Sequence, residues 1–257
     1  MSVVAQFLEM ARRSVLQTVR QPALVVPPIV FPLVLFAVNA SGLDAATRLP
    51  GFPTDAYLDF AIAFPFIQNA VFASINAGSS LARDVETGFL KRLALTPMQR
   101  AALLAGHLAG VMVVALASCL LYVLVGLLAG VDYRSGAAGV LVLVVLALLI
   151  SLAFASIGAF VGLRTGTGEA VQGFFPLFFV ALFLSSMSLP RNLIEQDWFR
   201  TIATYNPVSY LIEGLRSLII TGWDEEALAM GFGFAAMFAA VGIAASAGAL
   251  RTRLVRT

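Results

Sequence analysis

The sequence predicts an all-α integral membrane protein, and two observations lead to this prediction. First, 60% of the 257 residues are hydrophobic, 12% are charged and the mean hydropathy is +0.93, which is more apolar material than a soluble core of this size can bury. Second, the apolar residues form long runs such as LVLVVLALLISLAFASIGAF, which are apolar on every side. Strands of a membrane barrel would alternate apolar and polar residues in segments of about ten, so helices are favoured.

Six apolar runs come close to or exceed the roughly 18 residues that a membrane-spanning helix needs, and we expect six spans. The runs cover positions 23–42, 57–81, 101–130, 137–163, 170–189 and 226–250. The first run could also be a cleaved signal peptide, because three arginines precede it and the Val-Asn-Ala at 38–40 resembles a cleavage site. A retained helix is favoured, because the basic segment before it is long.

The segment 1–22 is predicted to form an amphipathic helix that lies on the membrane surface. Its apolar residues recur at helical spacing and share one face. They are Val4, Phe7, Leu8, Ala11, Val15 and Val19.

The distribution of basic residues predicts that both termini are cytoplasmic. With six spans and a cytoplasmic N-terminus, 11 of the 16 basic residues lie in cytoplasmic segments and 5 in outer segments. The positive-inside rule counts basic residues, so it favours this orientation.

The loop after the second span reads RDVETGFLKRLALTPMQR and places six charges between two apolar runs. Val85, Phe89 and Leu93 recur every four residues, which predicts a short amphipathic helix of about two or three turns. A solvated connector would explain the charges but not the apolar stripe. A docking surface for a soluble partner explains both and is favoured.

The third predicted span begins with a helix-start signal. Thr96 is a good N-cap, Pro97 fits the first helical position and Gln99 completes a T-x-x-Q capping box. We therefore expect an ordered loop that leads directly into the next helix.

Two motifs link the chain to a known family. The loop at 83–100 has the pattern D-x-E-x-G-x-x-x-R-L-x-x-T-P-x-x-R, and the stretch at 205–216 reads YNPVSYLIEGLR. The first resembles the cytosolic coupling segment of ABC-2 type exporter permeases, which include daunorubicin-resistance and nodulation-type export permeases. The second is similar to the N-P-x-x-Y-x-x-E-x-x-R signature of the same family. The resemblance covers nearly the whole chain and implies one transmembrane domain over 1–257.

The resemblance implies roles for two sets of residues. A coupling helix at 83–97 would meet a separate ATP-binding subunit through Asp84, Glu86, Gly88, Phe89, Arg92, Leu93, Thr96, Pro97 and Arg100. An extracellular re-entrant hairpin at 190–225 would contain Asn206, Pro207, Tyr210, Glu213 and Arg216.

The last two of these residues are predicted to form an ion pair. Glu213 and Arg216 lie three residues apart on one helical face and can pair. An ordinary surface helix outside the membrane, with a pair of little energetic value, remains the alternative.

Polar and aromatic residues inside the spans suggest a substrate path. Gln68, Asn69 and Asn76 lie in the second span, and Phe174 and Phe178 belong to an aromatic stripe in the fifth. Hydrogen bonds between helices explain the polar residues equally well, and packing or lipid contact explains the stripe. In the resembled family the second and fifth spans flank the central pathway. The resemblance therefore implies that the aromatic stripe forms a wall of this pathway, which would suit a hydrophobic or amphiphilic cargo.

The residues of an enzyme site are not apparent. The single lysine, Lys91, follows a leucine, so no P-loop is present. With one histidine, His107, and one cysteine, Cys119, the chain lacks the parts of a His-based metal site, a Ser-His-Asp triad or a disulfide framework. We expect no cofactor, metal or nucleic acid on this chain. The resemblance implies ATP and Mg²⁺ on the separate ATP-binding subunit.

The resemblance implies the permease subunit of an ATP-driven exporter in the plasma or inner membrane, which moves a hydrophobic, drug-like or lipid-like small molecule out of the cytoplasm. A second permease copy or a paralogue would complete the transporter. Pairs of glycines would permit close helix approach between two chains or within one chain. The pairs are Gly106 to Gly110, Gly126 to Gly130 and Gly158 to Gly162. A polysaccharide or glycolipid permease and a non-transport membrane scaffold are the alternatives.

Overall fold

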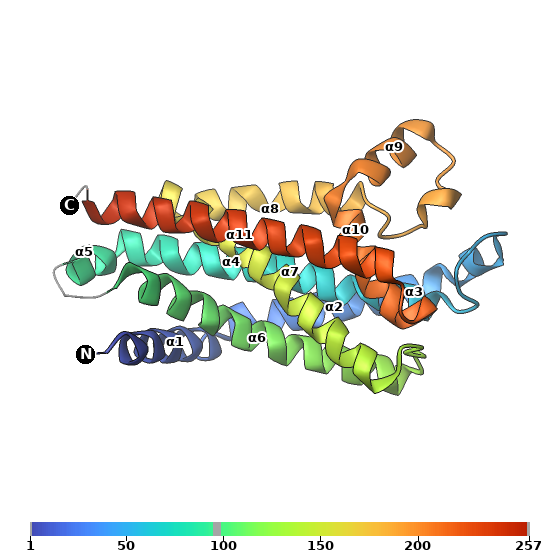
Figure 1. Ribbon diagram of the computed structural model, residues 1–257, viewed down its shortest axis with the longest axis horizontal. Helices are drawn as coiled ribbons and strands as arrows, with labels where there is room; N and C mark the ends of the chain where they lie inside the picture. Colours follow the sequence, from blue (N-terminus) through green and yellow to red (C-terminus); the bar gives the residue numbers. More distant parts are fainter. Residues whose placement is uncertain (1, 95–98, 256–257) are drawn as a thin grey trace.

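Long helices run along one axis of the protein, as the computed structural model in Figure 1 shows. The structure describes residues 2–94 and 99–255, and the regular elements within these ranges are helices. The α-helices are α1 (Val3–Val19), α2 (Pro22–Gly42), α3 (Tyr57–Ala61), α4 (Ala63–Glu86), α5 (Phe89–Ala94), α6 (Arg100–Ala129), α7 (Gly136–Thr165), α8 (Gly168–Phe183), α9 (Asp197–Tyr205), α10 (Pro207–Arg216) and α11 (Glu225–Val255). Short 3-10 segments lie at Asp44–Arg48 and Arg191–Leu193, and a π-helical turn at Ser217–Thr221.

Five helical stretches among the described residues are long and apolar enough to cross a membrane. They correspond to α2, α3 with α4, α6, α7 and α11, and they confirm five of the predicted spans. The remaining predicted span, 170–189, appears as α8, an apolar helix of 16 residues. At about 1.5 Å of rise per residue, α8 is roughly 24 Å long, somewhat shorter than the roughly 30 Å of a bilayer core.

The second span differs from its predicted limits of 57–81. It consists of α3 and α4, which meet at Ile62, and α4 then continues to Glu86. Pro65 explains the break, because it has no N–H to donate to the carbonyl of Ala61 and its ring crowds that turn. The first residues of the predicted coupling helix therefore belong to the spanning helix α4.

α4 lies at the centre of the bundle and packs closely on α7. Gly158 and Gly162 of α7 allow this approach, because a Cβ on either would fall 1.9 Å from the Ser74 carbonyl oxygen or 2.1 Å from that of Gly78. Gly106 and Gly110 of α6 similarly face α1. These two glycine pairs are therefore used for packing within one chain.

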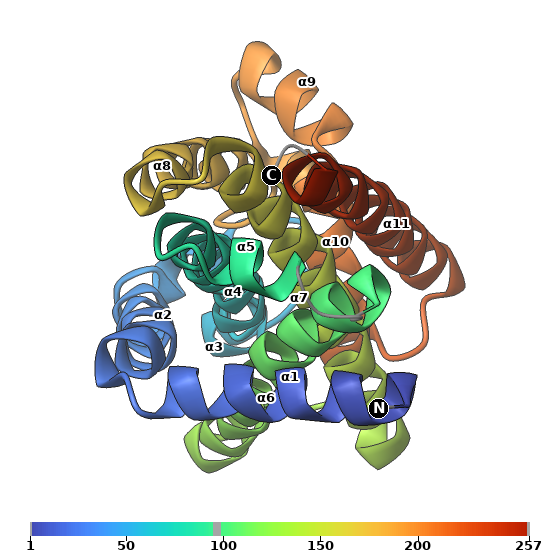
Figure 2. The same ribbon diagram turned by 90° about the vertical axis from the view of Figure 1, so that its left-hand side faces the viewer.

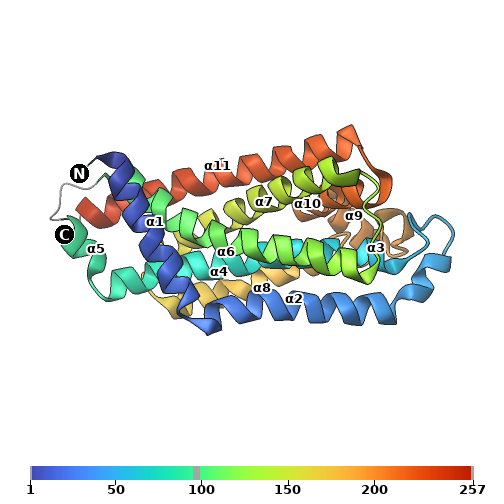
Figure 3. The same ribbon diagram turned by 90° about the horizontal axis from the view of Figure 1, so that it is seen from below.

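α1 lies across one end of the bundle at a steep angle to the long helices (Figures 2 and 3). The side chains that it buries are Gln6, Met10, Ser14 and Thr18. Three members of the predicted apolar face point outward instead, with exposed fractions of 65% for Val4, 57% for Leu8 and 59% for Val19. An outward apolar face is typical of a helix that lies on a membrane surface.

The two chain termini lie at the same end of the bundle (Figures 1 and 3). We call this the terminal end; it carries α1, α5 and the last turns of α11. The opposite end, which carries α3, α9, α10 and the start of α11, is the distal end. The predicted coupling segment therefore lies at the terminal end, and the predicted re-entrant segment at the distal end.

Candidate functional site

The coupling segment at the terminal end consists of two helices rather than the single predicted helix over 83–97. α4 ends at Glu86, and the chain turns through Thr87 and Gly88 before α5 begins at Phe89. Gly88 has a φ of +68°, a left-handed conformation that glycine adopts at little cost and that commonly ends a helix. The predicted four-residue spacing is therefore divided, with Val85 on α4 and Phe89 and Leu93 on α5.

Asp84 is buried and joins the coupling segment to α1. Its two carboxylate oxygens accept hydrogen bonds from Arg13 at 2.9 and 2.7 Å, the bidentate geometry that makes such pairs strong. The Asp84 side chain is 5% exposed and that of Arg13 is 35% exposed. The Arg13 guanidinium also lies 3.9 Å from the centre of the Phe89 ring. Arg13 thus connects α1, α4 and α5.

The apolar stripe of the coupling segment faces the bundle. Val85, Phe89 and Leu93 pack beside the core that contains the buried Leu90, so most of the stripe is not available as an exposed docking face. Most of the described side chains of this segment that remain exposed are charged: Arg83, Glu86, Lys91, Arg92 and Arg100, beside the uncharged Thr87 and Gln99. Glu86 also accepts a hydrogen bond from the Gly168 N–H at 3.2 Å, which links the end of α4 to the start of α8.

The start of α6 differs from the predicted capping box. Thr96 and Pro97 lie outside the described residues, and α6 begins at Arg100 with Gln99 as its N-cap residue. The Gln99 N–H donates to the Gln6 side chain of α1 at 2.9 Å. A side chain of the distant helix α1 thus binds the backbone of the residue that precedes α6.

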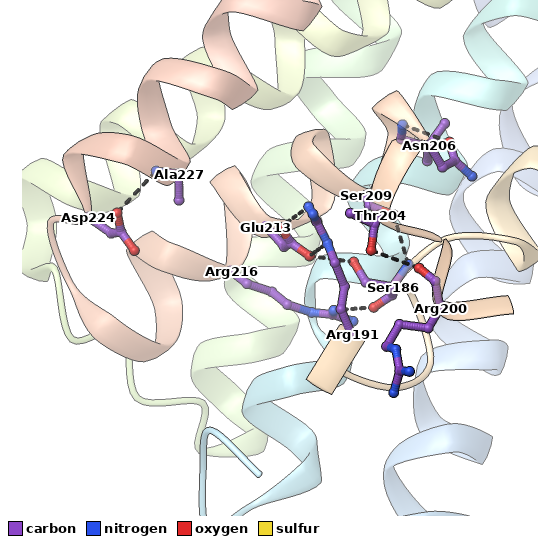
Figure 4. Close-up of polar contacts among 11 residues, drawn as sticks. Ser186, Arg191, Arg200, Thr204, Asn206, Ser209, Glu213, Arg216, Asp224 and Ala227 are labelled. Atoms are coloured by element: carbon purple, nitrogen blue, oxygen red, sulfur yellow. Dashed lines mark hydrogen bonds and ion pairs between the residues drawn. The ribbon is translucent and has the colours of Figure 1, made fainter. Parts of the chain in front are cut away.

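Arg216 is a buried residue of the distal end, and Figure 4 shows it beside Ser186. It is 6% exposed, and its guanidinium donates to the carbonyls of Phe60 at 3.1 Å, Ser186 at 2.6 Å and Met187. It also lies 3.4 Å from the centre of the Phe60 ring. Burial lowers the pKa of Arg216 to about 9, which leaves the group charged at neutral pH.

Glu213 pairs with Arg191, so the predicted pair between Glu213 and Arg216 is wrong. Arg191 Nε donates to Glu213 Oε1 at 2.7 Å, and its Nη2 contacts the other carboxylate oxygen. Ser186 Oγ donates to Glu213 at 2.9 Å. The physical reason is that Arg216 is turned inward by three backbone carbonyls, whereas Arg191 approaches Glu213 from the preceding loop and packs over Tyr210 at 4.3 Å.

Asn206 and Pro207 set the start of α10. Asn206 Oδ1 accepts the Val208 N–H at 3.0 Å, and Pro207 occupies the first turn, as the N-cap rules predict. The Asn206 amide also donates to the carbonyls of Ala181 at 2.6 Å and Leu184 at 3.0 Å. α10 is therefore fixed to the end of α8.

Two of the five predicted path residues, Asn69 and Asn76, line one small hollow among the described residues. Gln68 and Asn69 are 1% and 2% exposed, and Asn69 donates to the Ala115 carbonyl of α6 at 3.4 Å. The hollow that Asn69 and Asn76 share is about 10 Å³, room for about one water molecule. Phe178 packs on Phe154 with 5.5 Å between ring centres, whereas Phe174 is 43% exposed.

Two residues gained importance only from the structure. Arg13 and Arg191 are the ion-pair partners of Asp84 and Glu213. Sequence spacing gave no signal for these pairs, because the partners are 71 and 22 residues apart. The sequence did single out Arg13 as a basic residue of a helix predicted to lie on the membrane surface, but it did not indicate Asp84 as its partner.

Together the fold and its two polar ends define a multi-pass α-helical membrane protein. The model of the family described as ABC-2 type transporter matches residues 5–220, and the chain belongs to this family. It is 30% identical over 229 residues to the daunorubicin resistance ABC transporter permease protein DrrB1 of Streptomyces coeruleorubidus, covering 84% of this chain and 75% of the relative. It is 25% identical over 198 residues to the probable doxorubicin resistance ABC transporter permease protein DrrC of Mycobacterium tuberculosis, covering 77% and 69%. The family resemblance inferred from the two motifs is confirmed.

Proposed function

We propose that this chain is the transmembrane permease subunit of an ATP-driven exporter in the plasma or inner membrane, and that its cargo is a hydrophobic, drug-like or lipid-like small molecule. A separate ATP-binding subunit, which holds ATP and Mg²⁺, supplies the energy. A second permease copy or a paralogue completes the transporter. Membership of the ABC-2 family supports the ATP-binding partner. The names of the two relatives, which refer to daunorubicin and doxorubicin resistance, support a drug-like cargo.

The observation that carries this proposal is the construction of the terminal end. α5 presents exposed charges there, beside both termini, and it continues directly from the central helix α4 through the turn at Gly88. Arg13 ties α5 to α4 and α1. A displacement of α5 by an ATP-binding subunit would therefore reach the centre of the bundle through packed elements.

We also propose that α8 is the sixth span and that both termini are cytoplasmic. Five crossings would leave the N- and C-termini at opposite ends, but they lie at the same end (Figure 1). A crossing by α8 provides the even number that this arrangement needs. Most of the basic residues that the structure describes lie at the terminal end, which supports its cytoplasmic location by the positive-inside rule.

The extracellular re-entrant hairpin and the substrate path are part of the same proposal. The bond from Asn206 to the end of α8 and the buried Arg216 support a distal segment folded into the bundle. For the path, Phe174 supplies an exposed aromatic side chain on α8, and a second permease copy could cover it. Asn69 is already engaged with α6, so it would line the path only after a rearrangement.

The first test is to purify the tagged protein from its native host in mild detergent and to identify co-purifying proteins by mass spectrometry. We expect an ATP-binding subunit, and we expect its recovery to fall in the Arg92→Ala variant. Arg134→Ala removes an exposed arginine at the distal end and serves as the control. Recovery of the chain with no ATP-binding protein would favour a non-transport scaffold and contradict the proposal.

The second test measures coupling in proteoliposomes that contain both subunits. In Glu86→Ala, the link to the start of α8 is lost, and we expect ATP hydrolysis to continue while doxorubicin transport falls. Glu195→Ala removes an exposed glutamate of the distal loop and should transport normally. Normal transport by both Glu86→Ala and Gly88→Pro would overturn the coupling role of this segment.

A further inference from the structure

A cavity of about 290 Å³ opens at the terminal end between α4, α5, α7 and α11. Its walls have two kinds of side chain. The apolar ones are Val85, Leu90, Leu163 and Ala249, and the polar ones are Lys91, Arg164, Thr252 and Arg253. The described residues that line it include three cations and no carboxylate, so the cavity combines an apolar part with a positive charge.

Arg253 is a fixed part of this wall. Its Nε donates to the Leu163 carbonyl at 2.8 Å, and its Nη2 donates to the Arg164 carbonyl at 2.9 Å. These carbonyls belong to the last turn of α7, where backbone acceptors have no partner within the helix. Arg253 is therefore held in place by backbone carbonyls, and it forms no ion pair with the residues that the structure describes.

Lys91 and Arg164 are free to bind an anion. Both side chains are exposed, and within residues 2–94 and 99–255 neither forms an ion pair. Glu86, on the last turn of α4, accepts a hydrogen bond from the Gly168 N–H. Two cations from different elements, α5 and α7, thus border one cavity that no carboxylate of the described residues lines.

The cavity lies where the long helices end. α7 and α11 are long and apolar enough to span a membrane, so their ends at the terminal end reach the level of the lipid headgroups. α11 presents exposed apolar side chains along its length, among them Met237 and Val241, as a helix in contact with lipid does. A lipid beside α11 could therefore place its headgroup in the cavity.

We propose that this cavity binds the headgroup of an anionic glycerophospholipid. Lys91 and Arg164 would contact the phosphate oxygens, because ammonium and guanidinium groups form strong charge-assisted hydrogen bonds with phosphate. The apolar wall would receive the glycerol and the first acyl carbons. Basic pockets between spanning helices at the membrane surface suit such headgroups. The proposal depends on the bundle spanning a membrane and does not depend on the proposed transport function.

The consequence for the protein is a link between α5 and the ends of α7 and α11. Lys91 comes from α5, whereas Arg164 and Arg253 come from α7 and α11. A phosphate bound by all three would hold these elements together. A zwitterionic lipid would bring its own cation toward the same positive wall and would bind more weakly.

Native mass spectrometry of the full chain in detergent tests the proposal. Phosphatidylglycerol and phosphatidylcholine with the same acyl chains are titrated separately, and inorganic phosphate is added as a competitor. We expect one phosphatidylglycerol to bind in preference to phosphatidylcholine. Its affinity should fall about 30-fold in Lys91→Gln with Arg164→Gln, since each cation near a membrane surface contributes about a fivefold change. Arg48→Gln with Arg134→Gln removes the same charge from exposed residues at the distal end and should bind normally.

Four results would overturn the proposal. These are equal binding of the two lipids, unchanged affinity in the Lys91 and Arg164 double variant, an equal loss in the distal control, and displacement of the lipid by millimolar inorganic phosphate. The last result would assign the cavity to a soluble phosphate compound. Cross-linking in membranes with a photoactivatable phosphatidylglycerol gives a second readout on the wild-type chain. We expect the lipid to cross-link to residues at the ends of α5, α7 and α11. Cross-links to neighbouring proteins only, with none to this chain, would also contradict lipid binding.

Discussion

The arginines at the two ends of the bundle differ in what surrounds them. At the distal end, Arg216 is buried and its guanidinium donates to three backbone carbonyls. At the terminal end, Lys91 and Arg164 are exposed and border an open cavity. A buried charge that donates several hydrogen bonds favours one conformation, whereas an exposed charge remains available to a partner. The comparison indicates that the distal end is held rigid and that the terminal end is built to receive other molecules.

The largest effect is expected for Arg216→Ala. This change removes hydrogen bonds to Phe60, Ser186 and Met187 and leaves buried carbonyls without donors, at a cost of at least about 3 kcal/mol. We expect a large fall in melting temperature in detergent and little folded protein in membranes. Arg134→Ala, which removes an exposed arginine of the same end, should melt like the wild type. If both variants melted alike, the distal end would not be the rigid one.

The next effect is an asymmetry within the terminal end. Arg13→Ala leaves the Asp84 carboxylate, 5% exposed, without its cation, whereas Asp84→Ala leaves Arg13, 35% exposed, close to water. We expect a loss of about 3 kcal/mol for Arg13→Ala and of about half that for Asp84→Ala. Thermal unfolding of the two single variants and the double variant provides the measurement.

The double variant is the control for this prediction. It removes the stranded carboxylate, so it should be more stable than Arg13→Ala alone. Equal costs for the two single changes, with simple additivity in the double variant, would show that Arg13 and Asp84 are not coupled. The attachment of α1 to α4 would then not depend on this ion pair.

A smaller effect is expected at Gly88, the turn between α4 and α5. A Cβ at Gly88 meets no atom within 4 Å, but its φ is +68°, so Gly88→Ala should cost about 1 kcal/mol through the backbone alone. Gly248 of α11 also has open space and lacks the positive φ, so Gly248→Ala should stabilise by about 0.5 kcal/mol. Melting temperatures that shift in the same direction would contradict the conformation assigned to Gly88.

Much of the fold follows from the sequence, because a long apolar run has few alternatives in a membrane. The predicted spans 101–130 and 137–163 agree with α6 and α7 to within about two residues, the usual uncertainty of a helix end. The break before α4 and the turn at Gly88 depend on single residues, Pro65 and Gly88, within otherwise helical patterns. Helical periodicity is a property of many residues together, so it does not reveal a break that one residue causes.

The partners of the charged residues could not be predicted in this way. The rule for neighbours on a helix suggested Glu213 with Arg216, but the carbonyl of Phe60, 156 residues away, binds Arg216 instead. Asp84 was expected to line a docking surface and is instead buried against Arg13. Both outcomes depend on which distant segments meet, and local spacing carries no information about this.

The smallest effect is expected for an exposed ion pair at the distal end. It tests whether burial, or only the location at this end, determines how much a charged residue contributes to stability. Asp197 and Arg200 form an ion pair on α9 at the distal end, with side chains that are 86% and 47% exposed. Water and salt screen such a pair, so Asp197→Ala should change the melting temperature by less than about 2 °C. The same measurement on Arg191→Ala, whose partner Glu213 is 32% exposed, should give a clearly larger fall. If Asp197→Ala lowered the melting temperature as much as Arg191→Ala, burial would not explain the stability of the distal end. The location of a residue at that end would then be the better explanation.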